Sequence, residues 1–184
     1  TLGGGLNVII NDRVVYAYRH DPDDASSINH DAVSKMIRDS SGRIWITTYG
    51  GGLNLYLGDG KFRSYPRDDS LGTFSDLNAL DIVEGLDGIL WIGTDGGGIV
   101  RFDPVTETTD WLQQTDGTLA SDNIISLLRT DDSIWIGSRD RGVTRYAFGT
   151  GNTTKFSKVE GLSSDAVYGI LQDEARNIWM SGAK

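Results

Sequence analysis

An all-β fold, a β-propeller of four-stranded antiparallel blades, is predicted by three features of the sequence. A segment built around Ile-Trp-Ile recurs, and its tryptophans stand 46, 44 and 44 residues apart. An aliphatic run precedes each copy and a turn, glycine-rich in most copies, follows it. Glycine accounts for 24 of 184 residues and proline for only 3, as expected for many tight turns between short strands. A repeat of this length is typical of a propeller blade.

Each repeat predicts four strands in order. The first strand is an aliphatic segment, such as 32–37 or 124–128, that ends in polar or glycine-rich turn residues. The second strand carries the tryptophan, and the third follows the glycine turn, as at 53–56. A further turn, such as 58–60, leads into the fourth strand. A helical solenoid of similar period is rejected because glycines interrupt every window that is long enough for a helix.

The repeat divides the chain into whole and half blades of one propeller fragment. Residues 1–6 match residues 48–53, so we expect the chain to open within a repeat. Joining the two half blades would complete a fourth blade, either within one chain or between two chains that form an eight-bladed ring. Because a four-bladed ring is tightly curved, we expect a homodimer. The predicted whole blades are 29–66, 76–112 and 121–158, and the half blades are 1–19 and 163–184.

Composition argues against several classes of partner and site. The chain has 17 lysines and arginines against 26 aspartates and glutamates, and its net charge of −9 would repel a nucleic acid backbone. The absence of cysteine excludes disulfides and thiolate metal sites. No apolar run reaches the roughly 18 residues that a membrane-spanning helix needs, so we expect no membrane contact by this segment.

No catalytic residue, metal site or cofactor is predicted. His20 and His30 lie in a linker near Asp21, Asp23 and Asp24, and a solvated acidic linker explains this group better than a metal site does. No Gly-x-Ser-x-Gly elbow precedes a helix, which argues against a serine triad. Paired carboxylates from different blades stay open as an alternative, because sequence spacing does not reveal which acids converge.

The tryptophans fall into two groups. Trp45, Trp91, Trp135 and Trp179 hold the same place in successive repeats, which predicts that they pack between neighbouring blades. Trp111 stands outside that register, on a fourth strand, and is the tryptophan that the repeat explains least.

Three motifs recur across the repeats: Ile37-Arg38-Asp39, residues 91–94, and residues 51–56. Together they resemble the two-component regulator propeller repeats found in periplasmic sensing regions of bacterial hybrid histidine kinases and some diguanylate cyclases. The third repeat departs from the pattern, with Arg139-Asp140-Arg141 in place of the glycine run. The resemblance implies a non-catalytic, periplasmic sensor of small extracellular ligands such as oligosaccharides. It also implies a transmembrane parent receptor with kinase or cyclase activity.

Ligands usually meet a propeller on the face where the turns between the second and third strands gather with the blade-to-blade linkers. Residues that vary there are candidate contacts, because an arginine can clamp a carboxylate, as in an acidic sugar, and a tyrosine can stack. The candidate ligand-binding residues are Tyr49, Asp95, Arg139, Arg141, His30 and Asp31. A propeller enzyme of lyase or glycoside hydrolase type and a protein-binding scaffold are the alternatives.

Overall fold

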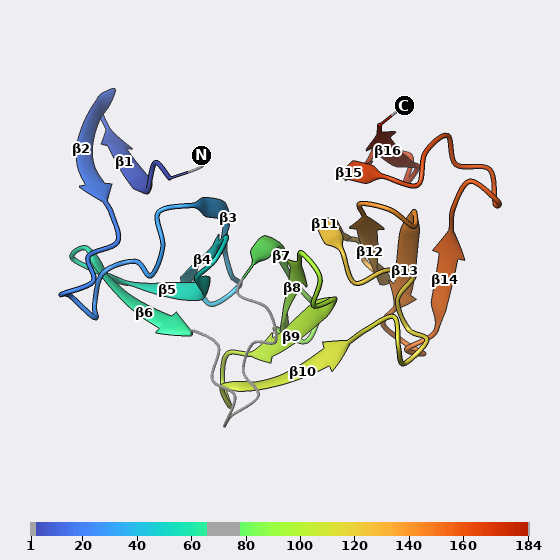
Figure 1. The fold of residues 1–184 in the computed structure, drawn as a ribbon, viewed down its shortest axis with the longest axis horizontal. Coiled ribbons are helices and arrows are strands. Elements are labelled where there is room, and N and C mark those ends of the chain that lie inside the picture. The colour runs from blue at the N-terminus through green and yellow to red at the C-terminus, as the bar shows by residue number, and fades with distance from the viewer. Residues whose placement is uncertain (1–2, 66–77, 184) are drawn as a thin grey trace. The chain divides into compact units, whose positions relative to one another are not determined.

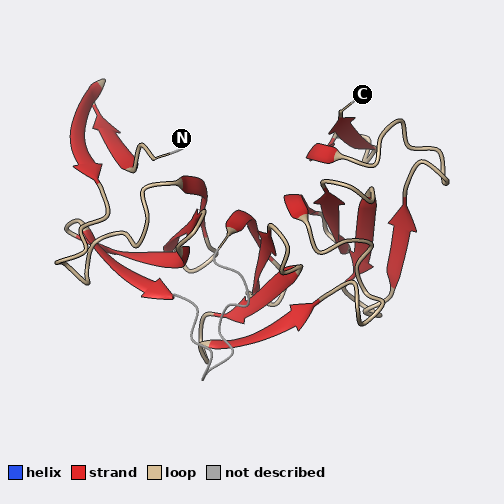
Figure 2. Cartoon of the chain, in the orientation of Figure 1, coloured by secondary structure: helices blue, strands red, loops and turns tan. Residues whose placement is uncertain are grey.

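The computed structural model describes residues 3–65 and 78–183, and every regular element within these ranges is a β-strand (Figure 2). The strands form five sheets, three of which have four strands that neighbour one another in chain order. This is the arrangement that the repeat predicts, and the all-β fold of four-stranded antiparallel blades is confirmed. The described residues contain no helix long and apolar enough to span a bilayer.

The chain divides into two compact units, Thr1–Ala79 and Leu80–Lys184. The first unit holds a two-stranded sheet, β1-β2, and a four-stranded sheet, β3-β4-β5-β6, which we call the first blade (Figure 1). Its strands are β1 (Leu6–Ile10), β2 (Arg13–Tyr18), β3 (Val33–Arg38), β4 (Ile44–Thr48), β5 (Gly52–Gly58) and β6 (Lys61–Tyr65).

Strand β7 begins at the border between the units, and the other strands of the chain lie in the second unit. Four-stranded sheets β7 to β10 and β11 to β14 are the second and third blades, and β15-β16 is a two-stranded sheet. The strands are β7 (Ala79–Glu84), β8 (Leu90–Thr94), β9 (Ile99–Asp103), β10 (Thr108–Leu112), β11 (Ile124–Arg129), β12 (Ser133–Ser138), β13 (Val143–Ala147), β14 (Thr153–Phe156), β15 (Val167–Gln172) and β16 (Ile178–Gly182).

The blade bounds expected from the sequence reach beyond the sheets into the linkers, and they stay a prediction. The expected ends at residues 66 and 76, and residues 1, 2 and 184 of the expected half blades, lie outside the described residues.

In the second unit, a tryptophan of one blade packs on the third strand of the next blade. Trp91 of β8 is only 2% exposed. Its ring centroid lies 4.9 Å from that of Tyr146, on β13, and 6.3 Å from that of Phe148, directly after β13. The predicted packing between neighbouring blades is therefore observed for Trp91. Trp179, at the same place in β16, is 62% exposed.

In the first unit, the β1-β2 sheet packs on the first blade through aromatic side chains. Tyr18 of β2 contacts Phe62 of β6 edge-on, with ring centroids 5.5 Å apart, and also contacts Tyr56 of β5 at 6.2 Å. Ile28, a residue of the linker between the two sheets, is fully buried in the same cluster. The linker therefore contributes to the core as well as to the connection.

Asp39 anchors the tryptophan of the first blade. Its carboxylate accepts hydrogen bonds from Trp45 Nε1 at 2.8 Å, from the backbone N of Ser41 and Arg43, and from Arg43 Nε. Burial raises the pKa of Asp39, but the hydrogen bonds from Trp45 and Arg43 and the charge of Arg43 outweigh it, so the pKa lies below its usual range. The folded blade thus favours the ionised carboxylate.

The same anchor is present in the terminal sheet and missing in the second blade. Asp173 accepts a hydrogen bond from Trp179 Nε1 at 2.8 Å. Gly85 stands at the corresponding place before Trp91, whose Nε1 is buried and has no hydrogen-bond partner among the described residues. The Nε1 atom of Trp111, on β10, is also buried and has no hydrogen-bond partner among the described residues. Trp91 is therefore held by packing rather than by a carboxylate.

Replacing Trp91 by alanine should lower the free energy of unfolding by about 3 to 5 kcal/mol, because it removes a buried ring from the contact between two blades. Val105→Ala is the control, and its cost should stay within about 0.5 kcal/mol because that side chain is 83% exposed. Urea denaturation measures both values. A loss under about 1 kcal/mol for Trp91→Ala would contradict the packing described above.

The stabilising effect of Asp39 should depend on pH. Because its folded pKa is below the unfolded value of about 3.9, its contribution is present above pH 4 and is lost as the pH falls through the folded pKa. The difference in unfolding free energy between wild type and Asp39→Asn should therefore narrow as the pH falls below about 4. Denaturation curves at pH 7, 4 and 3 measure this difference in unfolding free energy. A difference that does not change with pH would contradict the prediction.

Candidate functional site

A hydroxyl at the end of the second strand holds the turn that leads to the third strand. In the third blade, Ser138 Oγ accepts a hydrogen bond from Arg141 N and donates one to Gly142 O, each at 2.9 Å. Thr94 makes the corresponding two bonds in the second blade, each at 3.0 Å. Because the strand itself holds the turn, the side chains at the tip of the turn can vary while the backbone keeps its path.

The last residue of this turn has to be glycine. Gly142 and Gly98 have φ angles of +77° and +80°, in the region that side chains disfavour. A Cβ on Gly142 would lie 2.0 Å from the backbone O of Phe156, and one on Gly98 would lie 2.4 Å from that of Leu112. Both the backbone conformation and the close approach to the fourth strand therefore exclude a side chain.

Each of the three linkers that lie wholly within the described residues contains an aspartate that bonds in two directions. Its backbone O accepts a hydrogen bond from the turn glycine of the preceding sheet, and its carboxylate accepts one from a backbone N–H at the start of the linker. The aspartates are Asp31, Asp122 and Asp165; their O atoms bond Gly5, Gly98 and Gly142 at 2.9, 2.9 and 2.7 Å, and their Oδ1 atoms bond the N of His20, Gln114 and Lys158 at 2.7, 2.7 and 2.8 Å.

His30 stands where the other two linkers have serine. Its Nδ1 accepts a hydrogen bond from Ala32 N at 3.0 Å, just as the Oγ atoms of Ser121 and Ser164 accept one from the N two residues later at 3.0 and 3.1 Å. His20 Nδ1 lies 3.0 Å from the backbone O of Ile28. Two of the predicted ligand contacts, His30 and Asp31, are thus neighbours whose hydrogen bonds stabilise the linker. No group of three or more metal-ligating side chains occurs in residues 3–65 and 78–183.

Tyr49, Asp95 and Arg139 occupy the first position of three corresponding turns. Tyr49, in the first unit, is 38% exposed, and its N donates to Ala32 O at 2.8 Å. In the second unit, Arg139 Nη2 donates to Asp95 Oδ1 at 3.1 Å, so an ion pair joins the turns of two neighbouring blades. Because both side chains are partly exposed, this pair contributes little to stability.

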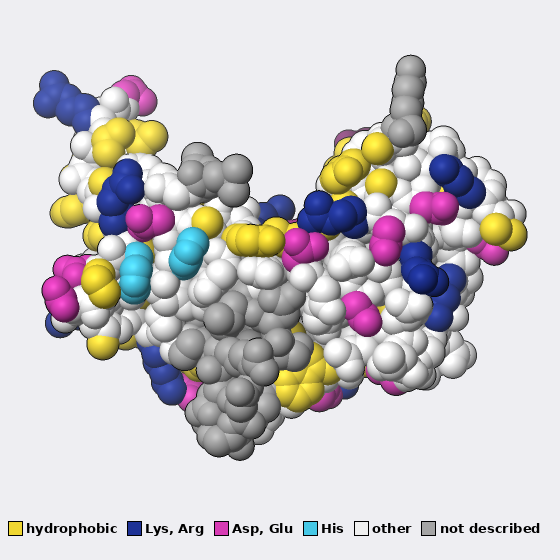
Figure 3. Space-filling model, in the orientation of Figure 1, with side chains coloured by type: hydrophobic (Ala, Val, Ile, Leu, Met, Phe, Trp, Pro, Cys, Tyr) yellow, Lys and Arg dark blue, Asp and Glu magenta, His cyan; other side chains and the backbone are white. Residues whose placement is uncertain are grey.

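Arg141 lines a cleft of about 500 Å³ in the second unit. This volume lies within the range of roughly 300 to 1,000 Å³ found for ligand pockets. The cleft is bounded by the turn of the third blade, by β14 and by the linkers on either side of that blade. Its lining residues are Gln114, Leu119, Ala120, Asp140, Arg141, Lys155, Ser157, Glu160 and Asp165. Over this part of the second unit, side chains of both charges are interleaved (Figure 3).

The acids of the cleft are already hydrogen-bonded by the protein. Asp140 accepts a bond from Ser121 Oγ at 2.6 Å and one from Asn123 Nδ2 at 3.2 Å. Glu160 Oε2 accepts bonds from the Oγ and the N of Ser157, and these hold the pKa of Glu160 below its usual range. At neutral pH the carboxylate of Glu160 is therefore ionised, and hydrogen bonds from the protein hold both Asp140 and Glu160 in place.

The cations of the cleft are less engaged. Lys155 Nζ donates to the backbone O of Gly117 at 2.7 Å, which leaves two of its N–H groups available. The guanidinium of Arg141 makes no hydrogen bond or ion pair within the described part of the chain; only its backbone N is bonded. Of the six predicted contacts, Arg141 alone lines this cleft.

Sequence reasoning missed most of the cleft residues. Asp140 had a signal, because it replaces a turn glycine of the other repeats. Lys155 and Glu160 had none, because the fourth strands and the linkers after them differ in sequence from blade to blade.

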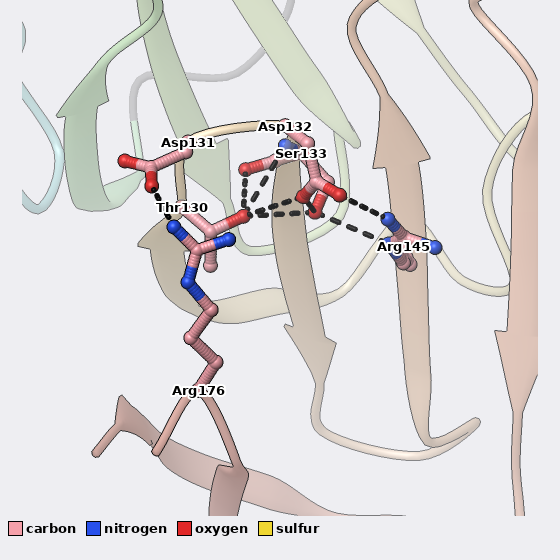
Figure 4. A network of polar contacts seen from close by, with 6 residues as sticks. All are labelled: Thr130, Asp131, Asp132, Ser133, Arg145 and Arg176. Atoms are coloured by element: carbon pink, nitrogen blue, oxygen red, sulfur yellow. Dashed lines mark hydrogen bonds and ion pairs between the residues drawn. The ribbon is translucent and has the colours of Figure 1, made fainter. Parts of the chain in front are cut away.

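A second polar cluster lies at the turn between β11 and β12 (Figure 4). Arg145 bonds Asp132 at 2.8 Å and also Ser133, while hydrogen bonds from Ser133 and Thr130 lower the pKa of Asp132. Arg176, from the turn between β15 and β16, donates a hydrogen bond to Asp131 of the β11–β12 turn at 3.1 Å. The bond from Arg176 joins the third blade to the terminal sheet.

Residues 27–50 match the family model described as two component regulator propeller. The matched segment holds Ile37-Arg38-Asp39, one of the motifs on which the resemblance was based. The resemblance to this repeat family is thereby confirmed. No curated protein matches the chain by sequence.

Solved structures share the fold at low sequence identity. The chain is similar to the extracellular domains of two putative hybrid two component systems from B. thetaiotaomicron, BT4673 (21% identity, TM-score 0.78, 94% of this chain) and BT3049 (20%, 0.59, 99%). It is also similar to virginiamycin B lyase from Staphylococcus aureus (19%, 0.61, 83% of this chain). The chain spans 24%, 30% and 50% of these three structures, respectively. Identities this low establish the fold alone.

Gly142→Ala should destabilise the third blade by about 2 to 3 kcal/mol, because the methyl group meets a backbone oxygen and the φ angle is positive. Gly149→Ala is the matched control: a Cβ there has no heavy atom within 4 Å, and the change should stay within about 0.5 kcal/mol. Thermal unfolding of both variants measures the effect. Equal, small changes would mean that the turn relaxes without cost.

Proposed function

Because residues 27–50 carry the two component regulator propeller repeat, we propose that the chain is a non-catalytic, ligand-sensing propeller segment of a bacterial two-component-type transmembrane receptor. The observation that carries the proposal is that the motifs of the matched repeat return in register through the chain, on successive sheets. Structures of the same fold from putative two component systems are extracellular domains, which supports a periplasmic location.

The ligand we propose is a small extracellular molecule such as an oligosaccharide, bound on the side of the turns and linkers. The local architecture supports this, because hydroxyls and linker aspartates hold the backbone and leave the side chains at the turns available for recognition. Signalling would then require a ligand that binds two states of the receptor with different affinity.

A propeller enzyme is the second candidate, since a lyase shares the fold. The histidines do not favour it. His20 and His30 each engage Nδ1 within a linker, and His30 has the position of a turn-holding serine in the other linkers. A role in holding turns explains both residues without a reaction. A protein-binding scaffold is the third candidate, and it would present as binding of a partner protein with no response to a small molecule.

A second copy of the chain is the protein partner that we propose. The β15-β16 sheet has exposed apolar side chains, Leu171 at 64% and Trp179 at 62%, where the second blade has the partly buried Val83 and the buried Trp91. In the register of the repeat, β15 and β16 correspond to first and second strands, and β1 and β2 to third and fourth strands. Pairing of β16 with β1 of another copy would complete a four-stranded blade and cover both open edges.

The chain should bind one class of oligosaccharide without turning it over. A panel of polysaccharide fragments, screened by the shift in the melting temperature of the protein, tests binding, and chromatography of the sugar tests turnover. Light scattering on the same samples measures the mass in solution, which should be that of two chains. Turnover that is lost when a cleft acid is replaced would favour the enzyme. A panel without any shift would contradict the sensing proposal, and a single-chain mass would contradict the dimer.

A further inference from the structure

The cleft beside Arg141 exists because an alanine replaces an asparagine. In the first blade, Asn29 fills the corresponding space: its Oδ1 accepts hydrogen bonds from Thr48 Oγ1 at 3.0 Å and Asn54 Nδ2 at 2.8 Å. In the third blade, the residue at this linker position is Ala120. The methyl group of alanine makes none of these bonds, and the space stays open.

Backbone hydrogen bonds show that the two positions correspond. Asn29 N donates to Asn54 Oδ1, on β5, at 3.1 Å, and Ala120 N donates to Thr144 Oγ1, on β13, at 3.0 Å. The linker therefore follows the same path in both blades. The difference between them lies in the side chains.

The same replacement makes room for Arg141. Its counterpart in the first blade is Gly51, where a Cβ would lie 2.4 Å from Asn29 Oδ1. A side chain at that turn position is thus incompatible with the asparagine of the linker. With Ala120 in the linker, the turn carries an arginine, and its guanidinium has no partner in the described residues.

The remaining hydrogen-bonding capacity of the cleft has two parts. Arg141 and Lys155 offer charged donors, which favour a carboxylate. Glu160 and Asp165 each use one carboxylate oxygen in a bond to the protein, Glu160 with Ser157 and Asp165 with the N of Lys158, so the other oxygen can accept a bond from a hydroxyl. Only Leu119 and Ala120 line the cleft with apolar groups, so its occupant has to be polar.

We infer that this cleft binds a small sugar acid, a polyol that carries one carboxylate. The carboxylate pairs with Arg141 and Lys155, and the hydroxyls donate to Glu160 and Asp165. A simple organic anion fits less well, because the three acids of the cleft repel it and it brings no donors for them. A neutral sugar leaves the guanidinium without a counter-charge. The inference rests on the proposed sensing function and names the chemistry of its ligand.

Isothermal titration of the full chain with D-glucuronate, at low salt, tests the inference. Glucose, which lacks the carboxylate, and acetate, which lacks the hydroxyls, should each bind at least tenfold more weakly than glucuronate. Added salt should weaken the binding of glucuronate, because it screens the contact between carboxylate and guanidinium. Equal affinities for the three ligands, or no heat with glucuronate, would overturn the inference.

Two variants locate the site and a third serves as the control. Arg141→Ala should weaken the binding of glucuronate at least tenfold by removing the charge. Ala120→Asn should do the same while keeping the arginine, because the amide refills the space as Asn29 does in the first blade. Arg176→Ala removes an exposed arginine that lies outside the cleft, and its affinity should equal that of the wild type.

Failure of this inference is distinguishable from failure of the proposed function. If a neutral oligosaccharide raises the melting temperature of the wild type and of both cleft variants equally, and glucuronate gives no heat with the wild type, the sensor proposal stands and the cleft inference is wrong. If neither glucuronate nor any fragment of the panel binds, both are wrong. Melting temperatures of the free variants, measured in the same runs, show whether each one is folded.

Discussion

A hydrogen bond from a turn glycine to the backbone oxygen of a linker aspartate connects sheet and linker at each of the three linkers that lie within the described residues. Gly142 and Asp165 make it at 2.7 Å, and two further linkers repeat it. The bond requires a glycine at the turn, because a side chain there would meet the backbone of the fourth strand, and it requires a linker whose backbone is fixed. The aspartate meets the second demand itself, because its carboxylate bonds a backbone N–H at the start of the linker. The rest of the arrangement, from the buried tryptophan of one blade to the aromatic ring that covers it on the next, depends on this spacing.

The fold was predictable because its cause repeats. Trp45, Trp91 and Trp135 mark the second strand of each blade, and the turns before and after them alternate with short apolar runs, so a single pattern gave the strands and their order. The roles of His30 and Asp31 were not read from it, although aligning their linker with 119–123 and 162–166 sets histidine against serine and aspartate against aspartate. The cleft could not be predicted from the repeat, because Lys155 and Glu160 belong to segments whose sequence differs from blade to blade.

Within a blade, one set of residues fixes the backbone and another set forms the surface at the turns, so one scaffold could present different surfaces to different molecules. Glycines, hydroxyls and linker aspartates determine the path of the backbone, and these positions are nearly the same in each described blade. The tips of the turns carry Tyr49, Asp95 or Arg139 on the same backbone. A change at such a tip alters charge and shape on the surface and leaves the blade intact. Under the proposed function, recognition would be local to one turn and its two linkers.

A turn that is completed by the following linker also dictates an order of assembly. The second blade cannot fix Gly98 until Asp122 has joined the chain, and the third cannot fix Gly142 until Asp165 has. During synthesis each blade would therefore mature one linker after its own last strand, and cooperativity would pass between nearest neighbours, as in other repeat proteins. A defect at one junction should thus slow the maturation of the blade before it, while more distant blades fold at their own rate.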